Sequence, residues 1–259
     1  MRHEKALLDK RRNLSEYLLM IQTIVTHECP DCGSLDLVKN GHDYKGSQKY
    51  HCNTCNRYGT LHAQRGYDQR TRTQVKRALL ERVSLRGIER VFGVSRWTVA
   101  DWLARWGQDL PSLTDTLSAA HWDDVLELDE VWSFVFRKAN KRWIWVALCR
   151  RTRQIVAYFI GDRSETSCLQ LWRRIPTAYV RCWTFSDFWA AYQFIFDPQR
   201  HQAVSKDSGQ TNHIERWFNS LRQRLARFVR KTLSFSKSDD FHEWAFRLFA
   251  HYYNLACIS

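Results

Sequence analysis

The sequence predicts a multidomain chain with a small β domain, an all-α domain and a larger C-terminal α/β domain. Three observations lead to this prediction. Two Cys-x2-Cys pairs enclose a short strand-like stretch between residues 29 and 55, and apolar residues recur at helical spacing between 71 and 106. From residue 121 onward, apolar runs typical of strands are followed by helical patterns. The 259 residues are enough for more than one domain.

The composition favours a polyanionic partner. The formal net charge is +13 and the isoelectric point is near 9.6, which is typical of proteins that bind nucleic acid. The alternative is a basic surface with no specific partner. Because the sequence contains neither an apolar run of about 18 residues nor a signal-peptide core, we expect a cytoplasmic protein without a membrane segment. In such a protein, eight cysteines favour metal binding over disulfides.

The first 28 residues are predicted to form a helical extension. Their charges are mixed, and Leu14, Leu18 and Ile21 recur at helical spacing. Three interpretations stay open: a simple extension, a dimer contact, or a start codon assigned too far upstream.

Residues 29–64 are predicted to form a zinc ribbon. The two cysteine pairs have the spacing C-x2-C-x19-C-x2-C, which is typical of one structural Zn²⁺ held by four thiolates: Cys29, Cys32, Cys52 and Cys55. The alternative is four reduced, buried cysteines without a metal. A zinc ribbon either binds DNA or only stabilises a small domain, and the sequence does not distinguish these roles.

Two short strands are predicted between the cysteine pairs, over Leu35–Val38 and Gln48–His51, with a turn region from Gly41 to Gly46. Gly33 and Asn56 directly follow the two pairs and suit the tight turns that such a metal site requires.

Residues 65–110 are predicted to form a helix-turn-helix domain. Its three helices are expected over Thr71–Val83, Leu85–Phe92 and Arg96–Trp106. The Gly93-Val94-Ser95 segment forms the turn, and the Ser95 hydroxyl is expected to cap the third helix. A short helix, a glycine turn and a second helix are typical of DNA-binding modules. The alternative is an ordinary helical hairpin.

Five apolar residues are expected to fill the angle between these helices: Ile88, Val91, Val94, Val99 and Leu103. Arg96, Trp97 and Thr98 are then exposed at the start of the third helix, where they are candidates for contacts with double-stranded DNA. Residues 111–120 are predicted to be a linker.

Residues 121–259 are predicted to form the α/β domain. Four strands are expected, over Val125–Trp132, Arg142–Cys149, Gln154–Ile160 and Tyr179–Phe185. Ser164 is expected to cap a helix that ends before Pro176, and Phe188–Phe196 is expected to be helical. Three strands, a helix, a strand and further helices follow the order of a ribonuclease-H-like sheet.

Three separated acids occupy the positions that such a sheet gives to metal ligands. Asp129 lies in the first strand, Asp187 just past the fourth, and Glu215 at the start of a basic helix. Carboxylate oxygens suit Mg²⁺ or Mn²⁺, and two such ions about 3.5–4 Å apart promote phosphodiester chemistry. Asp129 is expected to bridge both ions, with Asp187 on one and Glu215 on the other. The alternatives are a turn or helix cap for an aspartate after a strand and a solvated helix face for Glu215. If Asp187 is not the second acid, Asp197 or Asp207 is the next candidate.

Six basic residues and no acid occur between positions 216 and 231: Arg216, Arg222, Arg224, Arg227, Arg230 and Lys231. A solvated helix face would normally mix signs, so we expect this segment to bind phosphates. Arg222 lies two helical turns after Glu215 and is therefore expected to present its guanidinium to the DNA strand that the acids hold.

The chain resembles the bacterial insertion-sequence transposases of the IS-one type. The resemblance rests on the cysteine pairs, the helical module, the Leu128–Trp132 segment and the segment from Ile214 to Ser238, and it covers about residues 29–253. It implies a DDE triad of Asp129, Asp187 and Glu215, with Arg222 at the basic position beyond the glutamate. It also implies binding of terminal inverted repeats by the N-terminal modules.

The resemblance implies a nucleoid-associated bacterial enzyme that nicks the ends of its element and joins the freed 3′-OH ends to target DNA. Since two ends must be brought together, a homodimer or a higher oligomer is expected. Two alternatives stay open. The first is a domesticated DNA-binding regulator without catalysis, and the second is a stand-alone ribonuclease-H-like nuclease.

Overall fold

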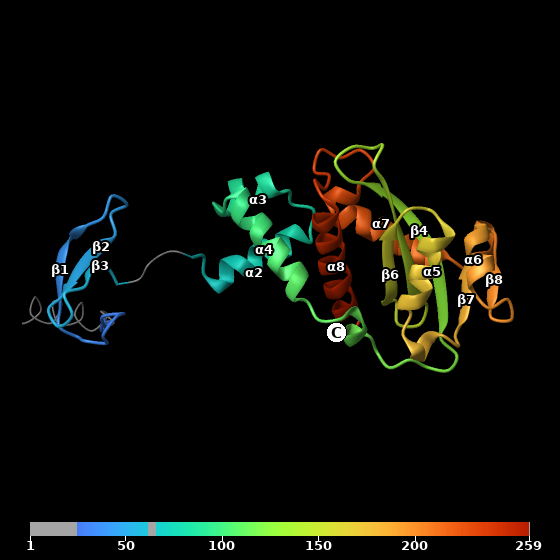
Figure 1. Cartoon of the computed structure of the whole chain (residues 1–259), viewed down its shortest axis with the longest axis horizontal. Helices are drawn as coiled ribbons and strands as arrows, with labels where there is room; N and C mark the ends of the chain where they lie inside the picture. The colour runs from blue at the N-terminus through green and yellow to red at the C-terminus, as the bar shows by residue number, and fades with distance from the viewer. Residues whose placement is uncertain (1–24, 62–65, 259) are drawn as a thin grey trace, which may run out of the picture. The chain divides into compact units, whose positions relative to one another are not determined.

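The computed structural model describes residues 25–61 and 66–258 (Figure 1). The chain divides into two compact units, Met1–Tyr67 and Asp68–Ser259, called here unit 1 and unit 2. The helix predicted over residues 1–28 lies outside the described residues as far as position 24, and residues 25–28 are not helical.

Unit 1 contains a three-stranded antiparallel sheet of β1 (Leu37–His42), β2 (Gln48–Cys52) and β3 (Tyr58–Thr60). The prediction placed the first strand two residues too early and missed β3, which is only three residues long. The turn begins at Asp43, because its carboxylate accepts hydrogen bonds at 2.8 Å from the backbone amides of Lys45 and Ser47.

Unit 2 begins with three helices, α2 (Gln69–Leu79), α3 (Leu85–Phe92) and α4 (Arg96–Asp109). Ser95 caps α4 as predicted, since its hydroxyl accepts from the amide of Thr98 at 3.2 Å. Gly93 ends α3 with a φ of 65°, a left-handed conformation in which a Cβ would be strained.

The core between these helices contains Ile88, Val94 and Val99 as predicted. Leu103 is also buried, but it packs in the cluster that includes α7 and α8. The prediction for Val91 is wrong, because this side chain is 70% exposed. On the eight-residue helix α3, the residues that pack against the core are Leu85, Ile88 and Phe92, and Val91 lies off that stripe.

Helix α4 packs closely against α8 (Asp239–Ala256). A Cβ atom at Gly107 would lie 2.5 Å from Cβ of Trp244, so the two helices can approach only because residue 107 is glycine. The segment 111–120, predicted as a linker, includes a 3-10 turn (η1, Leu113–Thr116). Thr116 is buried and its carbonyl accepts from Gln154 at 2.7 Å. These contacts fasten the three helices to the rest of unit 2.

The C-terminal sheet has five strands: β4 (Val125–Phe134), β5 (Lys141–Cys149), β6 (Ile155–Gly161), β7 (Trp183–Ser186) and β8 (His201–Ala203). Their order is β6-β5-β4-β7-β8; β4, β5 and β6 are antiparallel, and β7 and β8 run parallel to β4. The fourth strand begins four residues later than predicted, because Thr177–Tyr179 forms a 3-10 turn (η2). The prediction missed β8, which has only three residues.

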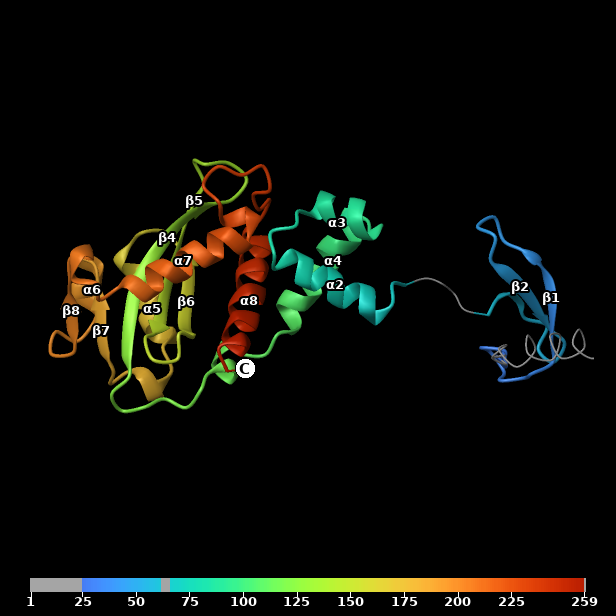
Figure 2. The ribbon, with the colours of Figure 1, turned by 180° about the vertical axis from the view of Figure 1, so that it is seen from behind.

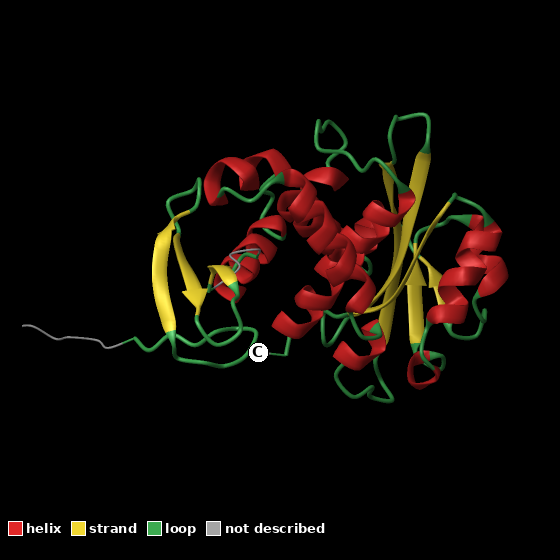
Figure 3. Cartoon of the chain, turned by 60° about the vertical axis from the view of Figure 1, so that its left-hand side comes forward, coloured by secondary structure: helices red, strands yellow, loops and turns green. Residues whose placement is uncertain are grey.

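Helices cover both faces of this sheet (Figures 2 and 3). Leu126 and Leu128 of β4 face α5 (Glu165–Arg174) and α6 (Ala190–Ile195). On the opposite face, Val131 packs with α7 (Asn212–Arg224) and α8. Since side chains alternate along a strand, Glu127 and Asp129 share the face that carries α7.

His242 in the first turn of α8 is fully buried, 3.0 Å from the Ser236 hydroxyl and stacked near the Phe228 ring. Burial, reinforced by the charge of Arg227, lowers its pKa to about 3. Below pH 6.5, His242 is therefore protonated in the unfolded chain but stays neutral in the folded chain. The free energy of unfolding consequently falls as the pH drops from 6.5 towards 3.

We expect His242 to lower the free energy of unfolding of unit 2 by about 2 kcal/mol when the pH falls from 7 to 5. The His242→Gln variant cannot take up this proton. Its loss of unfolding free energy over the same pH interval should therefore be smaller than that of the unmodified protein by about 2 kcal/mol. Urea unfolding followed by tryptophan fluorescence at both pH values measures the difference. An equal loss in both proteins would contradict the assignment.

Candidate functional site

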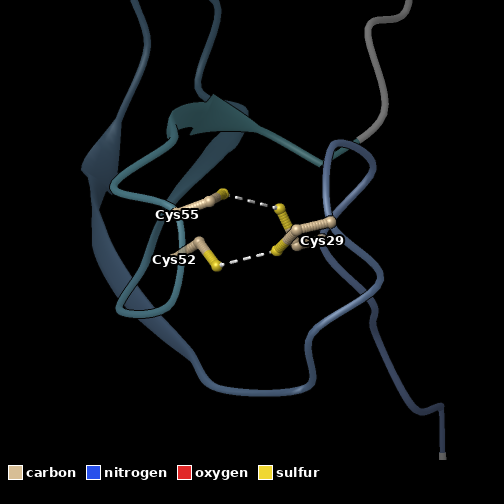
Figure 4. Close-up of side chains that lie close together, drawn as sticks. Cys29, Cys52 and Cys55 are labelled. Atoms are coloured by element: carbon tan, nitrogen blue, oxygen red, sulfur yellow. Dashed lines mark hydrogen bonds between the residues drawn. The ribbon is translucent and has the colours of Figure 1, made fainter.

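The four predicted zinc ligands converge in unit 1. The sulfur atoms of Cys29, Cys32, Cys52 and Cys55 all lie within 4.8 Å of one another. The Sγ atoms of Cys29 and Cys55 are 3.6 Å apart, as are those of Cys32 and Cys52. Figure 4 shows the side chains of Cys52 and Cys55 turned toward the loop that carries Cys29. Four ligands at about 2.3 Å from a tetrahedral Zn²⁺ would be separated by about 3.8 Å, so the arrangement fits this ion.

Two matching turns hold the cysteine pairs. The amide of Gly33 donates to the carbonyl of Cys29 at 2.8 Å, and the amide of Asn56 donates to that of Cys52 at 2.9 Å. Gly33 and Asn56 have φ values of 72° and 60°, as the sequence predicted for tight turns at these positions. The backbone amide of Cys55 contributes most to lowering the pKa of Cys52 to about 6.

The three predicted acids come from three separate elements of unit 2. Asp129 lies in the middle of β4, Asp187 directly follows β7, and Glu215 lies in the first turn of α7. The sheet brings the first two together because β4 and β7 are adjacent and parallel. Within residues 25–61 and 66–258, the four cysteines are the group whose ligand atoms lie close enough together to hold one metal ion, and Asp129, Asp187 and Glu215 do not form such a group. Asp197 follows α6 and Asp207 lies in the 3-10 turn η3 (Lys206–Ser208).

The surroundings of Asp129 favour its protonated form. Burial raises its pKa to about 7, and the negative charges of Glu130, Asp187 and Glu215 add to the effect. The backbone amide of Glu130, which donates to Oδ1 of Asp129 at 2.8 Å, opposes it. Asp187 and Glu215 are thus close enough to act on Asp129, whose protonated form is favoured first by burial and then by the neighbouring negative charges.

The acids of β4 and its surroundings divide into two groups. Three buried carboxylates each pair with an arginine: Asp124 with Arg151 at 2.6 Å, Glu127 with Arg150 at 2.9 Å, and Glu130 with Arg163 at 2.6 Å. By contrast, no ion pair of residues 25–61 and 66–258 includes Asp129, Asp187 or Glu215. Neighbouring carboxylates without a cation are a fitting set of donors for a hard divalent ion.

Arg222 lies beside this group of acids. Its side chain is half-buried, and burial, together with the charge of Arg230, lowers its pKa while the charge of Asp129 opposes the change. Its Nε atom is buried and has no hydrogen-bond partner within the described part of the chain. A buried donor without a partner is costly unless a ligand supplies the acceptor.

The remaining predicted DNA contacts are in different surroundings. Arg216, Arg230 and Lys231 are exposed. Arg224 pairs with Glu81 at 2.6 Å, and Arg227 is half-buried, with Nη1 3.4 Å from both the Ser236 hydroxyl and the Phe241 carbonyl. At the start of α4, Arg96 and Trp97 are exposed, whereas Thr98 is half-buried with its hydroxyl 3.0 Å from that of Ser95.

The sequence analysis missed a second group of charged residues around the acids. Oε2 of Glu130 accepts from the Tyr192 hydroxyl at 2.9 Å, while its partner Arg163 lies between the Trp143 and Trp189 rings, 4.6 and 4.2 Å from their centres. On the other face of β4, Glu127 is completely buried. The available signal was the occurrence of two glutamates inside an otherwise apolar strand, where an unpaired charge would be costly.

Within the described residues, no helix is both long and apolar enough to cross a membrane.

Comparisons with known proteins agree on one family. Residues 125–256 match the family described as IS1 transposase. The insertion element IS1 4 protein InsB of Escherichia coli (strain K12) is 35% identical over 129 residues, which cover 50% of this chain and 73% of the relative. The insertion element IS1 protein InsB of Shigella flexneri is 36% identical over 129 residues, covering 50% of this chain and 93% of the relative.

The region with β4, β7 and α7 is therefore that of a transposase. The chain belongs to the IS1 transposase family, as its resemblance to IS-one-type enzymes predicted. Membership of this family implies an enzyme that cleaves DNA.

Proposed function

We propose that this protein is a DDE transposase that binds the terminal inverted repeats of its element, nicks the ends and transfers the 3′-OH ends to target DNA. The main support is the contrast between the arginine-paired buried acids and the unpaired acids Asp129, Asp187 and Glu215. The family match and the InsB relatives support the choice of transposase over a domesticated regulator or a stand-alone nuclease.

The architecture supports this proposal. The strand order β6-β5-β4-β7-β8, with β4 in the centre and Asp129 upon it, supports a ribonuclease-H-like domain over residues 121–259. The glycine turn between α3 and the Ser95-capped α4 supports a helix-turn-helix within residues 65–110. The converging thiols support a zinc ribbon with one structural Zn²⁺ over residues 29–64.

Asp129, Asp187 and Glu215 are the residues that would hold Mg²⁺ or Mn²⁺, two ions per site. Such ions activate an attacking oxygen and stabilise the leaving oxygen of a phosphodiester. The protein itself places Asp129 at the centre of a rigid sheet and brings Glu215 to it on α7. The buried Nε of Arg222 offers a hydrogen bond to a phosphate oxygen beside Asp129. Together these residues would bind and orient the strand to be cut.

DNA binding is assigned to the exposed basic residues. Arg216, Arg230 and Lys231 are free to contact phosphates, so affinity should fall as salt rises. We assign Arg224 and Arg227 chiefly to stabilising the fold of unit 2. Arg224 pairs with Glu81, and Arg227 contacts Ser236 and Phe241. Since two element ends must be joined to one target, the active form is proposed to be a homodimer or a higher oligomer.

We expect end recognition to depend on Arg96. If its guanidinium makes a bidentate contact with guanine, Arg96→Ala should weaken binding of end DNA by roughly 1–3 kcal/mol and reduce the preference over random DNA. The matched control is Arg105→Ala, at the far end of the same helix, where the arginine pairs with Asp101 at 3.0 Å. Fluorescence anisotropy with both DNAs measures the effect. An unchanged preference in Arg96→Ala would reject this role.

Uncut and pre-cut end DNA, assayed side by side with a target plasmid and Mg²⁺, test the proposed function. A transposase nicks the uncut ends and joins the pre-cut ends to the plasmid. A regulator would do neither. A nuclease would cut without forming a joined product, and either of these two results would overturn the proposal.

A further inference from the structure

Helix α7, which carries Glu215, receives its N-terminal cap from a distant strand. Thr211, at the N-cap position, makes no side-chain capping bond. Oε2 of Glu127 on β4 instead accepts from the backbone amides of His213 at 2.9 Å and Ile214 at 3.0 Å. A carboxylate at this position satisfies unpaired amides and interacts favourably with the helix dipole. The start of α7 is thereby fixed to the strand that carries Asp129.

The same carboxylate organises a wider network. Oε1 of Glu127 accepts from Arg150 Nε at 2.9 Å and lies 2.6 Å from Nδ1 of His213. Nη2 of Arg150 donates to the carbonyl of Gln210 at 2.7 Å, and this bond holds the segment that leads into α7. Its guanidinium also lies 5.0 Å from the ring centre of Phe185 on β7.

Each unpaired acid lies two residues beyond a member of this network. Asp129 follows Glu127 on the same face of β4, Asp187 follows Phe185, and Glu215 follows His213. Glu127 and Phe185 are register partners in the parallel pair of β4 and β7. A single buried carboxylate thus connects the three elements that supply the acids.

From this geometry we propose that Glu127 is the positioning residue of the metal site, and that with Arg150 it sets the spacing of Asp129, Asp187 and Glu215. The inference rests on the proposed function. Glu127 does not touch the substrate or the ions. It acts by keeping α7 and β7 in register with β4, since small displacements of catalytic groups have large effects. Partners that orient metal ligands typically alter metal affinity 10- to 100-fold when they are changed.

The test uses a matched pair of variants. Glu127→Gln leaves Arg150 without a charged partner, and Asp124→Asn does the same to Arg151. Each lost ion pair joins a buried carboxylate near the start of β4 to an arginine of the β5–β6 turn; Arg150 is half-buried and Arg151 is exposed. Asp124 contacts Arg151 and the His121 amide rather than α7. Thermal unfolding of both variants shows whether their losses of stability are similar.

Two measurements on the full chain bound to pre-cut end DNA decide the question. Mn²⁺ binding is followed by the electron paramagnetic resonance of free Mn²⁺, and joining is followed against Mg²⁺ concentration. We expect Glu127→Gln to raise the Mn²⁺ dissociation constant and the half-saturating Mg²⁺ concentration about 10- to 100-fold, and Asp124→Asn to leave both unchanged. Equal behaviour of the two variants would overturn the inference.

A further variant keeps the test decisive if Glu127→Gln does not fold. Arg150→Lys retains the charge but loses the fork that spans Glu127 and Gln210. It should shift the metal dependence in the same direction, and an unchanged dependence would also overturn the inference. If the unmodified protein neither binds Mn²⁺ nor cleaves, the proposed function fails; if it does both, the variants test the role of Glu127 alone.

Discussion

Replacing Asp129 by asparagine is expected to abolish both nicking and joining while leaving the binding of element ends intact. The amide is nearly isosteric, so the sheet should persist, but it removes the charge that we propose to be shared between two metal ions. End binding should survive because Asp129 is not among the residues to which DNA binding is assigned. Gel-based cleavage and strand-transfer assays, with a parallel binding assay on the same DNA, measure both parts.

Asp197→Asn provides the control for this variant. Asp197 is an exposed acid that follows α6, and the spacing along the chain alone allows it as a substitute for Asp187. Its replacement should leave both reactions unchanged, whereas Asp187→Asn and Glu215→Gln should behave like Asp129→Asn. Activity retained by Asp187→Asn would show that the second acid is not the one after β7.

Loss of one zinc thiolate is the second large effect that we expect. The described part of unit 1 contains little else to stabilise it, because its sheet is short and β1 is largely exposed. Structural Zn²⁺ in small domains contributes about 10–16 kcal/mol, so binding and folding are coupled. Cys52→Ser should therefore remove the metal, expose unit 1 to proteolysis and weaken end binding, with unit 2 still folded.

Metal analysis and limited proteolysis test this expectation. The unmodified protein, purified without chelator, should contain one zinc per chain. Cys257→Ser, which changes an exposed thiol at the end of α8, should retain it. Two results would contradict the proposed zinc site: no zinc in the unmodified protein, or a full complement of zinc in Cys52→Ser.

The parts that the sequence predicted well are those with strong local signals. The cysteine spacing, the glycine turn at Gly93 and the cap at Ser95 are each decided by a few neighbouring residues. The long strands β4 and β5 also had clear apolar patterns. In contrast, β3 and β8 contain three residues each and exist because a neighbouring strand pairs with them, which no local pattern reveals.

Part of the site was not predictable for the same reason. The sequence indicated Asp129, Asp187 and Glu215 as separate acids. It did not indicate the cap that Glu127 provides to α7, because the two amides that it binds are 86 and 87 positions further along the chain. Arg224 and Arg227 appeared as two more charges in a basic run. Only the fold shows that Glu81 and the Ser236 region engage them.

Counting bound metal ions tests the central claim most directly. The unmodified protein, zinc-loaded and bound to pre-cut end DNA, is titrated with Mn²⁺ while the free ion is followed by electron paramagnetic resonance; Asp129→Asn is titrated alongside. The account predicts two Mn²⁺ ions per active site in the unmodified complex and loss of tight binding in the variant. The same number of ions bound with the same affinity by both proteins would contradict it.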